Sequence, residues 1–401
     1  MKKRILLRSD FLPPETISGA NRVESMARIL STDHDVCVVT LKPSKPSPAH
    51  YRTLSLEHHD SQLPYNVRRT IAFHPSRGKF LVRALREHMM SLVLGGHALS
   101  IPADIVVTSL PSMFLGPVGL VLAKIKRAKF VLDVRDITWN YAREVTNPSR
   151  LMKLGLWALE KYMILVVRQA DLVFGVTPGI TKLLVESGVS PEMAITVPNA
   201  ISGDLLTIGS PANDRVPDQA RSKVTYSGSI GYNQDLGILL EVACALPEVD
   251  FFFAGDGAEL PLLKRKASKL GAQNVHFLGY LSREALLKVY AESDVLFAKI
   301  RSTPTLDATA IPSKLFEYMA TGKPLVYAGK GLAVEFLEKI GCALTVPSED
   351  PEAITAATQK LLSDARLRHT LGSKGRDFVR RNYNRDELME GLARELRSRF
   401  G

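Results

Sequence analysis

The chain has 401 residues, of which 45% are hydrophobic and 23% are charged, so a globular protein of two domains is expected. Its net charge of +11 predicts an acidic partner, but only 7% of the residues are aromatic and no zinc-finger, basic-zipper or RNA-binding signature occurs, so nucleic acid is not expected. The three cysteines lie far apart, which excludes a cysteine metal pair and indicates a reducing compartment.

The beginning of the sequence predicts a cytoplasmic protein. MKKRILLRSDF runs directly into a strand-like segment, without the apolar core and cleavage site of a signal peptide. No stretch reaches the roughly 18 uninterrupted apolar residues that a membrane span needs.

Short apolar runs alternate with helical patterns along nearly the whole chain, which is typical of parallel sheets covered by helices on both faces. A first series of strands is expected at 4–9, 35–41, 104–110, 129–135, 172–177 and 194–199. A second series is expected at 223–228, 250–256, 275–280, 295–300, 324–329 and 343–348. The two series predict an α/β protein with two doubly wound Rossmann-like domains that face a central cleft, with ligands at the carboxyl ends of the strands.

The break between the two series predicts the domain boundary. Residues 201–223 are rich in Gly, Pro, Ser and Asp and have little helical periodicity, as expected for a linker. We expect an N-terminal domain over 1–205, a C-terminal domain over 206–379, and a final helix over 380–401 that packs back on the first domain.

In the first half, two loops contain candidate site residues. Gly19 and Ala20 follow a Pro-rich loop and precede an amphipathic helix, where the backbone would approach a ligand closely. Asp133, Arg135 and Asp136 cluster at the end of a strand, a common place for functional charges. A structural Arg–Asp pair accounts for this cluster equally well.

Basic residues gather between the second and third predicted strands. The segment 67–94 reads as a basic amphipathic helix that rests on an anionic membrane, which would make the protein peripheral on the inner face of the plasma membrane. An ordinary domain helix with a solvated cationic face is the alternative. Its cations are Arg68, Arg69, Arg77, Lys79, Arg83 and Arg86. The apolar segment 153–170 is expected to be a buried helix.

In the second half, YSGSIGYNQDLG (226–237) joins a strand to a helix expected to begin near Asn233. Backbone N–H groups of Gly228, Ser229 and Gly231 at a helix N-terminus would bind phosphate without a cationic side chain. A tight turn that requires glycine explains the loop equally well. Gly255, Asp256 and Gly257 repeat the arrangement after the next strand.

The segment ATAIPSKLFEYMATGKPLVYAGK (308–330) predicts a helix with Ser313 as its N-cap and Leu315 on the buried face. Lys314 then lies in the first turn, where it opposes the helix dipole unless an anion is nearby. Glu317 lies one turn further along and would accept hydrogen bonds from a ribose diol. An exposed Lys–Glu pair on a surface helix is the alternative.

Taken in order, YSGSIGYNQDLGILLEVA, AGDGAE, NVHFLGY, YAESDVLFA and PSKLFEYMATGKPLV resemble the GT-B-fold nucleotide-sugar glycosyltransferases of family 4. The resemblance is closer to the branch that makes bacterial surface polysaccharides, which includes WbuB-type N-acetylfucosaminyl transferases. It covers nearly the whole chain and is dense from 171 to 384. It implies transfer of a sugar from a nucleotide-diphosphate donor, of the UDP-N-acetylhexosamine type, to a lipid-linked or oligosaccharide acceptor, with retention of configuration and without a metal or other cofactor.

The resemblance also implies roles for particular residues. Lys314 would stabilise the leaving diphosphate, and Asp136 is the first acidic candidate for steering the acceptor hydroxyl. The acceptor side would include Gly19, Ala20 and Arg135. The donor-binding residues would be Gly228, Ser229, Gly231, Gly255, Asp256, Gly257, Ser313, Lys314, Leu315 and Glu317.

The sequence departs from the family pattern in two places. Many relatives carry an Arg and a Lys in the first loop of the second domain, where this chain has Ser229 and Gln234. Many also carry two glutamates, of which Glu317 fits the second, while Thr309 occupies the place of the first. These departures leave the donor sugar and the anomeric outcome open, together with two alternatives: a non-catalytic nucleotide-sugar-binding subunit and a nucleotide-sugar epimerase of the same fold.

Overall fold

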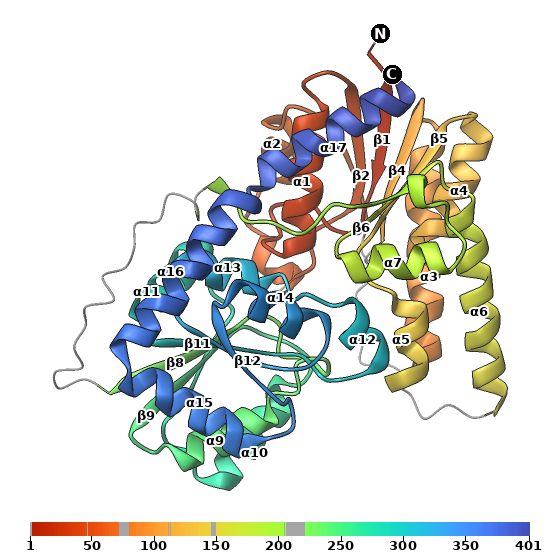
Figure 1. Cartoon of the computed structure of the whole chain (residues 1–401). Coiled ribbons are helices and arrows are strands. Elements are labelled where there is room, and N and C mark those ends of the chain that lie inside the picture. Colours follow the sequence, from red (N-terminus) through yellow and green to blue (C-terminus); the bar gives the residue numbers. More distant parts are fainter. Residues whose placement is uncertain are drawn as a thin grey trace. The chain divides into compact units, whose positions relative to one another are not determined.

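The computed structural model describes residues 2–45, 47–71, 80–110, 112, 114–145, 150–203, 205 and 221–401, without the side chains of 80–84, 141–143, 145 and 151. It divides into two compact units, Met1–Asn199 with Arg385–Gly401, and Ala200–Asn384 (Figure 1). The sequence placed these boundaries after 205 and 379. The second unit begins at Ala200, and next to this boundary the N–H of Ile201 donates to the carbonyl of Tyr383 in the same unit at 3.0 Å.

The first unit is built on a seven-stranded parallel sheet in the order β3-β2-β1-β4-β5-β6-β7. Its strands are β1 (Arg4–Arg8), β2 (Asp35–Leu41), β3 (Asn66–Thr70), β4 (Ile105–Leu110), β5 (Lys129–Val134), β6 (Leu172–Gly175) and β7 (Ala194–Thr196). Its helices are α1 (Ser18–Leu30), α2 (Leu56–Ser61), α3 (Phe80–Leu99), α4 (Leu115–Lys126), α5 (Thr138–Val145), α6 (Arg150–Arg168), α7 (Pro178–Glu186) and α17 (Arg385–Phe400).

Helices cover both faces of this sheet. On one face, α1 and α17 lie side by side, and Met26, Leu392 and Leu396 share a core with Leu7 and Val38 of the strands (Figure 1). On the other face, α3, α4 and α6 contribute to a second core with the same strands. The central strand β4 is buried at every position, which is why its sequence IVVTSL is nearly continuously apolar.

Strand β3 is the strand that the sequence did not predict among the described residues. It lies at the edge of the sheet, and its first four residues alternate between exposed and half-buried, so the sequence NVRRT lacks the apolar run of a central strand. The side chain of Arg69, 5% exposed, lies 2.7 Å from the carboxylate of Asp60. The interpretation of 67–70 as part of a basic amphipathic helix is therefore wrong, while Arg77, Lys79 and the side chain of Arg83 lie outside the described residues.

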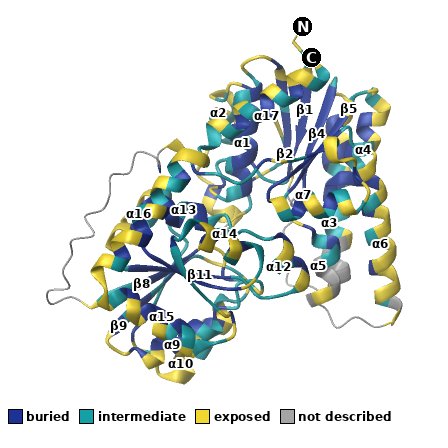
Figure 2. Ribbon diagram, viewed as in Figure 1, coloured by how far each residue is buried: buried dark blue, intermediate teal, exposed yellow. Residues whose placement is uncertain are grey.

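Helix α6 is not the buried helix that the sequence predicted. One side of it, with Met163 and Val166, packs in the core, but the other side exposes large apolar residues to solvent (Figure 2). Because α6 is apolar on both sides, its periodicity did not separate the buried side from the exposed one. The exposed residues are Leu154 (60% exposed), Trp157 (47%), Tyr162 (50%) and Leu165 (59%).

The second unit is built on a six-stranded parallel sheet in the order β10-β9-β8-β11-β12-β13, with helices on both faces. Its strands are β8 (Ser222–Ser227), β9 (Val249–Ala254), β10 (Val275–Gly279), β11 (Val295–Lys299), β12 (Leu325–Ala328) and β13 (Ala343–Val346). Its helices are α9 (Gly237–Ala245), α10 (Leu260–Leu270), α11 (Arg283–Glu292), α12 (Pro304–Thr309), α13 (Lys314–Thr321), α14 (Leu332–Ile340), α15 (Pro351–Ser363) and α16 (Ala365–Asn382).

The two sheets confirm the predicted fold class of two doubly wound Rossmann-like domains. In each, the chain order reverses beside the first strand, so the loops after β1 and β8 lie at the switch points where ligands of such sheets bind. Among the described residues, no helix is both long enough and apolar enough to span a membrane.

Candidate functional site

The glycine loop after β8 leaves Gly228 and Ser229 exposed at the carboxyl end of the sheet. Most of its backbone donors, however, already have partners. The N–H of Gly228 donates to Ala254 O at 2.8 Å, and the N–H of Ile230 donates to Asp256 O at 2.9 Å. The N–H of Gly231 faces Gln234 Oε1 at 3.3 Å. The N–H of Gly228 is therefore not free as expected, whereas the N–H of Ser229 has no partner among the described residues and the long bond from Gly231 to the Gln234 side chain is readily exchanged for a ligand.

Gly255 and Gly257 are explained by the packing of the second loop against the first. Both have a positive φ, 149° and 159°. A β-carbon on Gly255 would lie 1.8 Å from the carbonyl oxygen of Gly228, and one on Gly257 would lie 2.3 Å from that of Ile230. The exposed Asp256 side chain accepts from the N–H of Gly257 at 2.7 Å. Glycine is therefore required here for the two loops to touch, whatever they bind.

Lys314 is brought directly to the first glycine loop. Its Nζ lies 2.6 Å from Tyr226 Oη and 3.8 Å from the centre of the Tyr226 ring. A β-carbon on Gly228 would lie 3.0 Å from this Nζ. Burial lowers the pKa of Lys314 to about 7, and the negative charge of Glu317 opposes this shift. An amine that titrates near neutral pH thus lies against the exposed glycine at the end of β8.

The other residues of the PSK segment differ from their predicted roles in detail. Ser313 occupies the predicted N-cap position, but its backbone is helical and its side chain makes no capping hydrogen bond. Leu315 is fully buried and contributes to the core. Glu317 lies 3.4 Å from Nη1 of Arg283 on α11, so Lys314 and Glu317 have different partners rather than forming a surface pair.

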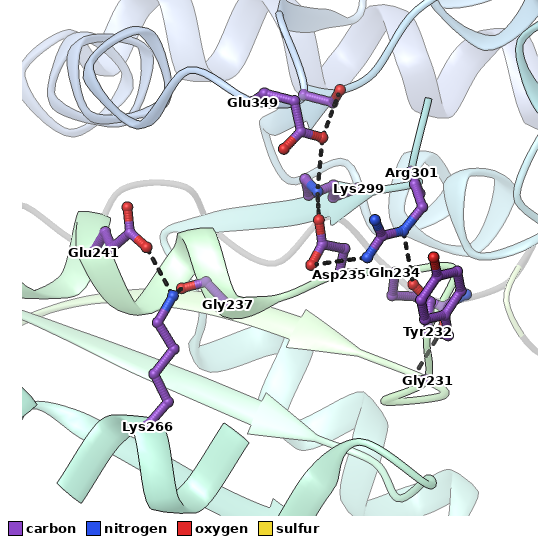
Figure 3. Close-up of polar contacts among 11 residues, drawn as sticks. Gly231, Tyr232, Gln234, Asp235, Gly237, Glu241, Lys266, Lys299, Arg301 and Glu349 are labelled. Carbon is purple, nitrogen blue, oxygen red and sulfur yellow. Dashed lines mark hydrogen bonds and ion pairs between the residues drawn. The ribbon is translucent and has the colours of Figure 1, made fainter. Parts of the chain in front are cut away.

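Two cations at the end of β11 hold the glycine loop, and neither was predicted from the sequence. Lys299 is fully buried, and its Nζ lies 3.0 Å from Asp235 Oδ2 (Figure 3). Arg301 lies 3.2 Å from Asp235 Oδ1, and its guanidinium stacks 4.2 Å from the ring centre of Tyr232. Asp235 has a φ of 45°, and α9 begins only at Gly237, later than predicted. The available signal was their position, Lys299 as the last residue of a strand that neighbours β8 and Arg301 just after it.

A cavity of about 180 Å³ opens beside this ion-pair cluster. Its walls come from the glycine loop, from α10 and from Arg301. Of the predicted donor-binding residues, Gly231 lines it, whereas Lys314 and Glu317 do not. It is lined by Ile230, Gly231, Tyr232, Asp235, Leu236, Gly237, Glu259, Leu262, Leu263, Lys266 and Arg301.

In the first unit, the structure brings Gly19 and Arg135 together. Gly19 is the second residue of α1, and a β-carbon on it would lie 2.0 Å from Nη1 of Arg135. Ala20 is fully buried, so its side chain is part of the core. Asp136 follows the end of β5, where its residue is exposed; burial of its carboxyl raises the pKa, and the charge of Arg135 opposes this shift.

Asp133 has a structural role in the same cluster. It is fully buried and lies 2.8 Å from Nη2 of Arg22, and it accepts from Ser109 Oγ at 2.8 Å. A further acid at this edge was not predicted: burial and the charge of Glu87 raise the pKa of Asp10, just after β1, to about 7.

Two parallel α/β units of this kind, each with a glycine at its switch point, define the architecture of the GT-B transferases. The model described as Glycosyl transferase 4-like domain matches residues 19–200, and that described as Glycosyl transferases group 1 matches residues 213–378. The chain belongs to the family 4 glycosyltransferases and is a sugar-transferring enzyme, which confirms the resemblance found in the sequence.

Similar proteins of known sequence lie at low identity. WcaI of Escherichia coli (strain K12), assigned to colanic acid biosynthesis, is 24% identical over 320 residues, 73% of this chain and 74% of that protein. The GDP-mannose-dependent alpha-(1-6)-phosphatidylinositol monomannoside mannosyltransferase of Mycolicibacterium smegmatis is 30% identical over 155 residues, 38% of this chain and 41% of that protein.

Solved structures share the fold over nearly the full length. Anabaena HepE in complex with UDP and glucose has a TM-score of 0.71 and 15% identity, covering 99% of this chain and 100% of that one. Sucrose-phosphate synthase from Thermosynechococcus elongatus has a TM-score of 0.75 and 16% identity, covering 100% of this chain and 99% of that one.

Proposed function

We propose that this glycosyltransferase moves a sugar from a nucleotide-diphosphate donor of the UDP-N-acetylhexosamine type to a lipid-linked or oligosaccharide acceptor in cell-surface polysaccharide synthesis. Transfer retains anomeric configuration and needs no metal, as the resemblance implies. The observation that carries the donor site is the contact of the Lys314 amine with the exposed glycine at the end of β8.

The similar proteins support this reading at different levels. HepE binds UDP, which favours a uridine donor, and WcaI is assigned to a surface polysaccharide. The mycobacterial relative uses GDP-mannose, which makes GDP-mannose the competing donor.

The chemistry rests on the charge that develops on the leaving group. As the glycosidic bond breaks, the diphosphate gains negative charge, and a nearby ammonium group stabilises it more strongly than it stabilises the intact donor. The diphosphate in turn raises the pKa of Lys314, so the amine, with a pKa of about 7 in the free protein, takes up a proton when the donor binds.

The other proposed donor and acceptor contacts involve Ser229, Gly231, Glu317 and Asp136. Ser229 is exposed beside Gly228, and the N–H of Gly231 becomes available to phosphate once the Gln234 side chain turns away. Glu317 exchanges its contact with Arg283 for the ribose hydroxyls. Asp136 steers the acceptor hydroxyl from the first unit.

A panel of nucleotide sugars tests the proposal. UDP-N-acetylglucosamine, UDP-N-acetylgalactosamine, UDP-glucose and GDP-mannose are each incubated with the protein and an acceptor extract, with and without EDTA. We expect release of UDP from a UDP-N-acetylhexosamine, unaffected by EDTA and reduced by Lys314→Ala. Release from GDP-mannose alone would replace the donor assignment, and binding without turnover of any donor would favour the non-catalytic subunit.

We further propose that the acceptor is met at an anionic membrane and that the contact is made by α3, α4 and α6 rather than by the predicted segment alone. These neighbouring helices expose apolar side chains, and Trp and Tyr are the residues typical of membrane interfaces. Lys124, Lys153 and Lys161 are exposed among them and suit anionic lipid. The exposed apolar residues are Leu85, Met89, Leu92, Val121, Ile125, Leu154, Trp157, Tyr162 and Leu165.

Flotation with phosphatidylglycerol-containing vesicles tests this surface. The double variant Trp157→Ser and Leu165→Ser is expected to lose binding. Leu262→Ser, which changes a leucine of the second unit that is 53% exposed, serves as the control and is expected to bind like the wild type. Equal binding by all three proteins would reject the surface.

A further inference from the structure

We propose that Tyr226 is a positioning residue of the donor site, whose hydroxyl holds the Lys314 amine against the glycine loop. The inference rests on the proposed function, in which Lys314 stabilises the donor diphosphate. Tyr226 would act on the ligand only through Lys314. Its hydroxyl would hold the lysine of α13 at a fixed position relative to the loop after β8.

The hydroxyl of Tyr226 joins two parts of the chain that are distant in sequence. Tyr226 is a fully buried residue of β8. Its hydroxyl donates to the carbonyl of Ser229 in the glycine loop, and it accepts from Lys314 Nζ at 2.6 Å. A phenol has one hydrogen to donate and lone pairs to accept with, while the carbonyl only accepts, so this division of roles fits both contacts. The position of the amine is thereby tied to the loop backbone.

The ring of the same residue supports the charged form of the amine. Nζ lies 3.8 Å from the ring centre, within the range of a cation–π contact. Burial raises the pKa of Tyr226 well above its usual value of 10, so the phenol keeps the hydrogen that it donates to Ser229. Tyr226 therefore contacts Lys314 as a neutral phenol whatever the charge of the amine.

Two further tyrosines bind the last residue of β8, Ser227. Tyr318, on α13 one turn after Lys314, accepts from the N–H of Ser227 at 2.7 Å. The hydroxyl of Tyr290 lies 2.5 Å from Ser227 Oγ. Helix α13 is thus attached twice to the end of β8, once by a tyrosine of the strand and once by a tyrosine of the helix. Buried hydroxyls are costly unless bonded, and here each is bonded.

The charges around Lys314 make its titration a usable readout. Glu317 favours the ammonium form, and Arg283, which pairs with Glu317, reduces that effect. The other titratable groups of the network are the buried phenols Tyr226, Tyr290 and Tyr318. Because the Tyr226 oxygen accepts from the amine, it stabilises the ammonium form, and its removal lowers the pKa of Lys314 further.

The test compares Tyr226→Phe with Tyr327→Phe. Tyr327 is also a fully buried strand tyrosine of the second unit, and among the described residues its hydroxyl has no hydrogen-bond partner. Donor KM, kcat and the pH dependence of nucleotide-sugar binding are measured for each. We expect Tyr226→Phe to lower kcat/KM by about tenfold, by the usual cost of losing a hydrogen bond to a charged group. We also expect the pH above which binding weakens to move downward, while Tyr327→Phe matches the wild type.

The double variant Lys314→Ala and Tyr226→Phe distinguishes positioning of Lys314 from a purely structural role of Tyr226. Once Lys314 is alanine, adding Tyr226→Phe should change kcat/KM by less than about twofold, because the group that it positions is gone. An undiminished tenfold effect in that background would overturn the inference, and so would an unshifted pH profile of Tyr226→Phe.

A milder change covers the case in which Tyr226→Phe does not fold. Replacing Tyr226 with 3-fluorotyrosine keeps the hydroxyl but makes it a weaker acceptor, so a smaller downward shift of the same pH profile is expected, and no shift overturns the inference. If the wild type binds no nucleotide sugar, the proposed function fails and the inference with it. If Lys314→Ala impairs the enzyme and Tyr226→Phe does not, the inference alone fails.

Discussion

Both units place a cationic side chain against a glycine that follows the first strand of their sheet. In the first unit, Nη1 of Arg135 lies 2.0 Å from the point where Gly19 would carry a β-carbon. In the second unit, Nζ of Lys314 lies 3.0 Å from the corresponding point on Gly228. In each unit a cation lies against the backbone at a switch point. The two cations come from different elements, because Arg135 follows β5 whereas Lys314 begins α13.

The two cations differ in what surrounds them. Burial lowers the pKa of both, but two carboxylates, Asp133 and Asp136, oppose the shift for Arg135. For Lys314 only Glu317 does so, and the amine makes its hydrogen bond to a neutral phenol. The burial of Arg135, to which the charge of Arg22 adds, is thus opposed by two carboxylates of its own unit, whereas Lys314 has one nearby carboxylate. This difference, more than the glycine loops themselves, favours the proposal that the second unit binds the diphosphate.

The largest expected effect separates the two cations directly. Lys314→Ala should lower turnover at saturating donor by about tenfold or more, because a charge that stabilises the leaving group is lost. Arg135→Ala should leave donor KM unchanged and act on acceptor KM. Steady-state kinetics with each substrate varied in turn measures both. Unchanged turnover of Lys314→Ala would remove this lysine from the mechanism and with it the contrast between the units.

The next effect concerns the glycine of the second unit. Gly228 has a φ of 116°, so Gly228→Ala strains the backbone and also brings a methyl group against the Lys314 amine. We expect a loss of about 1–3 kcal/mol in the free energy of unfolding, measured by urea titration, and weaker donor binding. A variant as stable as the wild type with normal donor binding would show that the loop accommodates the methyl group and does not depend on this approach.

The sequence predicted the sheets well because central parallel strands are continuously apolar, as in IVVTSL of β4 and VLFAK of β11. It missed β3 because an edge strand needs no such run. It treated α6 as buried because an apolar helix has the same pattern whether its second side meets protein, solvent or lipid.

The candidate site was predictable only in part. Lys314 stood out because a lysine in the first turn opposes the helix dipole, and the structure brings it to Gly228. Its partner Tyr226 did not stand out, because a buried tyrosine in a strand reads as one more apolar residue. The pairing of the Gly228 and Ile230 N–H groups with the next loop was equally hidden, since contacts between loops leave no periodic trace in the sequence.

The effect of pH also distinguishes the two cations. The pKa of Lys314 is about 7 in the folded protein and 10.5 ordinarily, so between these values the unfolded chain binds more protons, and stability rises with pH across that window. Donor binding has the opposite dependence: above pH 7 it requires uptake of a proton, so affinity falls by up to about tenfold per pH unit. Arg135 remains protonated throughout and adds nothing to either curve.

Calorimetric titration with a nucleotide sugar between pH 6 and 9 measures this dependence, since its diphosphate diester does not titrate in that range. Lys314→Ala is the matched control and should bind more weakly with a flat profile. A flat profile for the wild type would mean that the amine keeps one charge state in the free and bound protein, and the contrast with Arg135 would then rest on geometry alone.

The smallest effect is expected for Gly19→Ala. Gly19 lies within α1, where alanine is favoured over glycine by about 1 kcal/mol, and the group that its methyl would meet is the end of a flexible arginine. The guanidinium swings aside, so thermal unfolding should stay close to that of the wild type, while acceptor KM rises a few-fold because Arg135 is displaced. Donor KM should not change. An increase in donor KM as large as that caused by Gly228→Ala would mean that both glycines serve the donor, and the division of roles between the two units would be wrong.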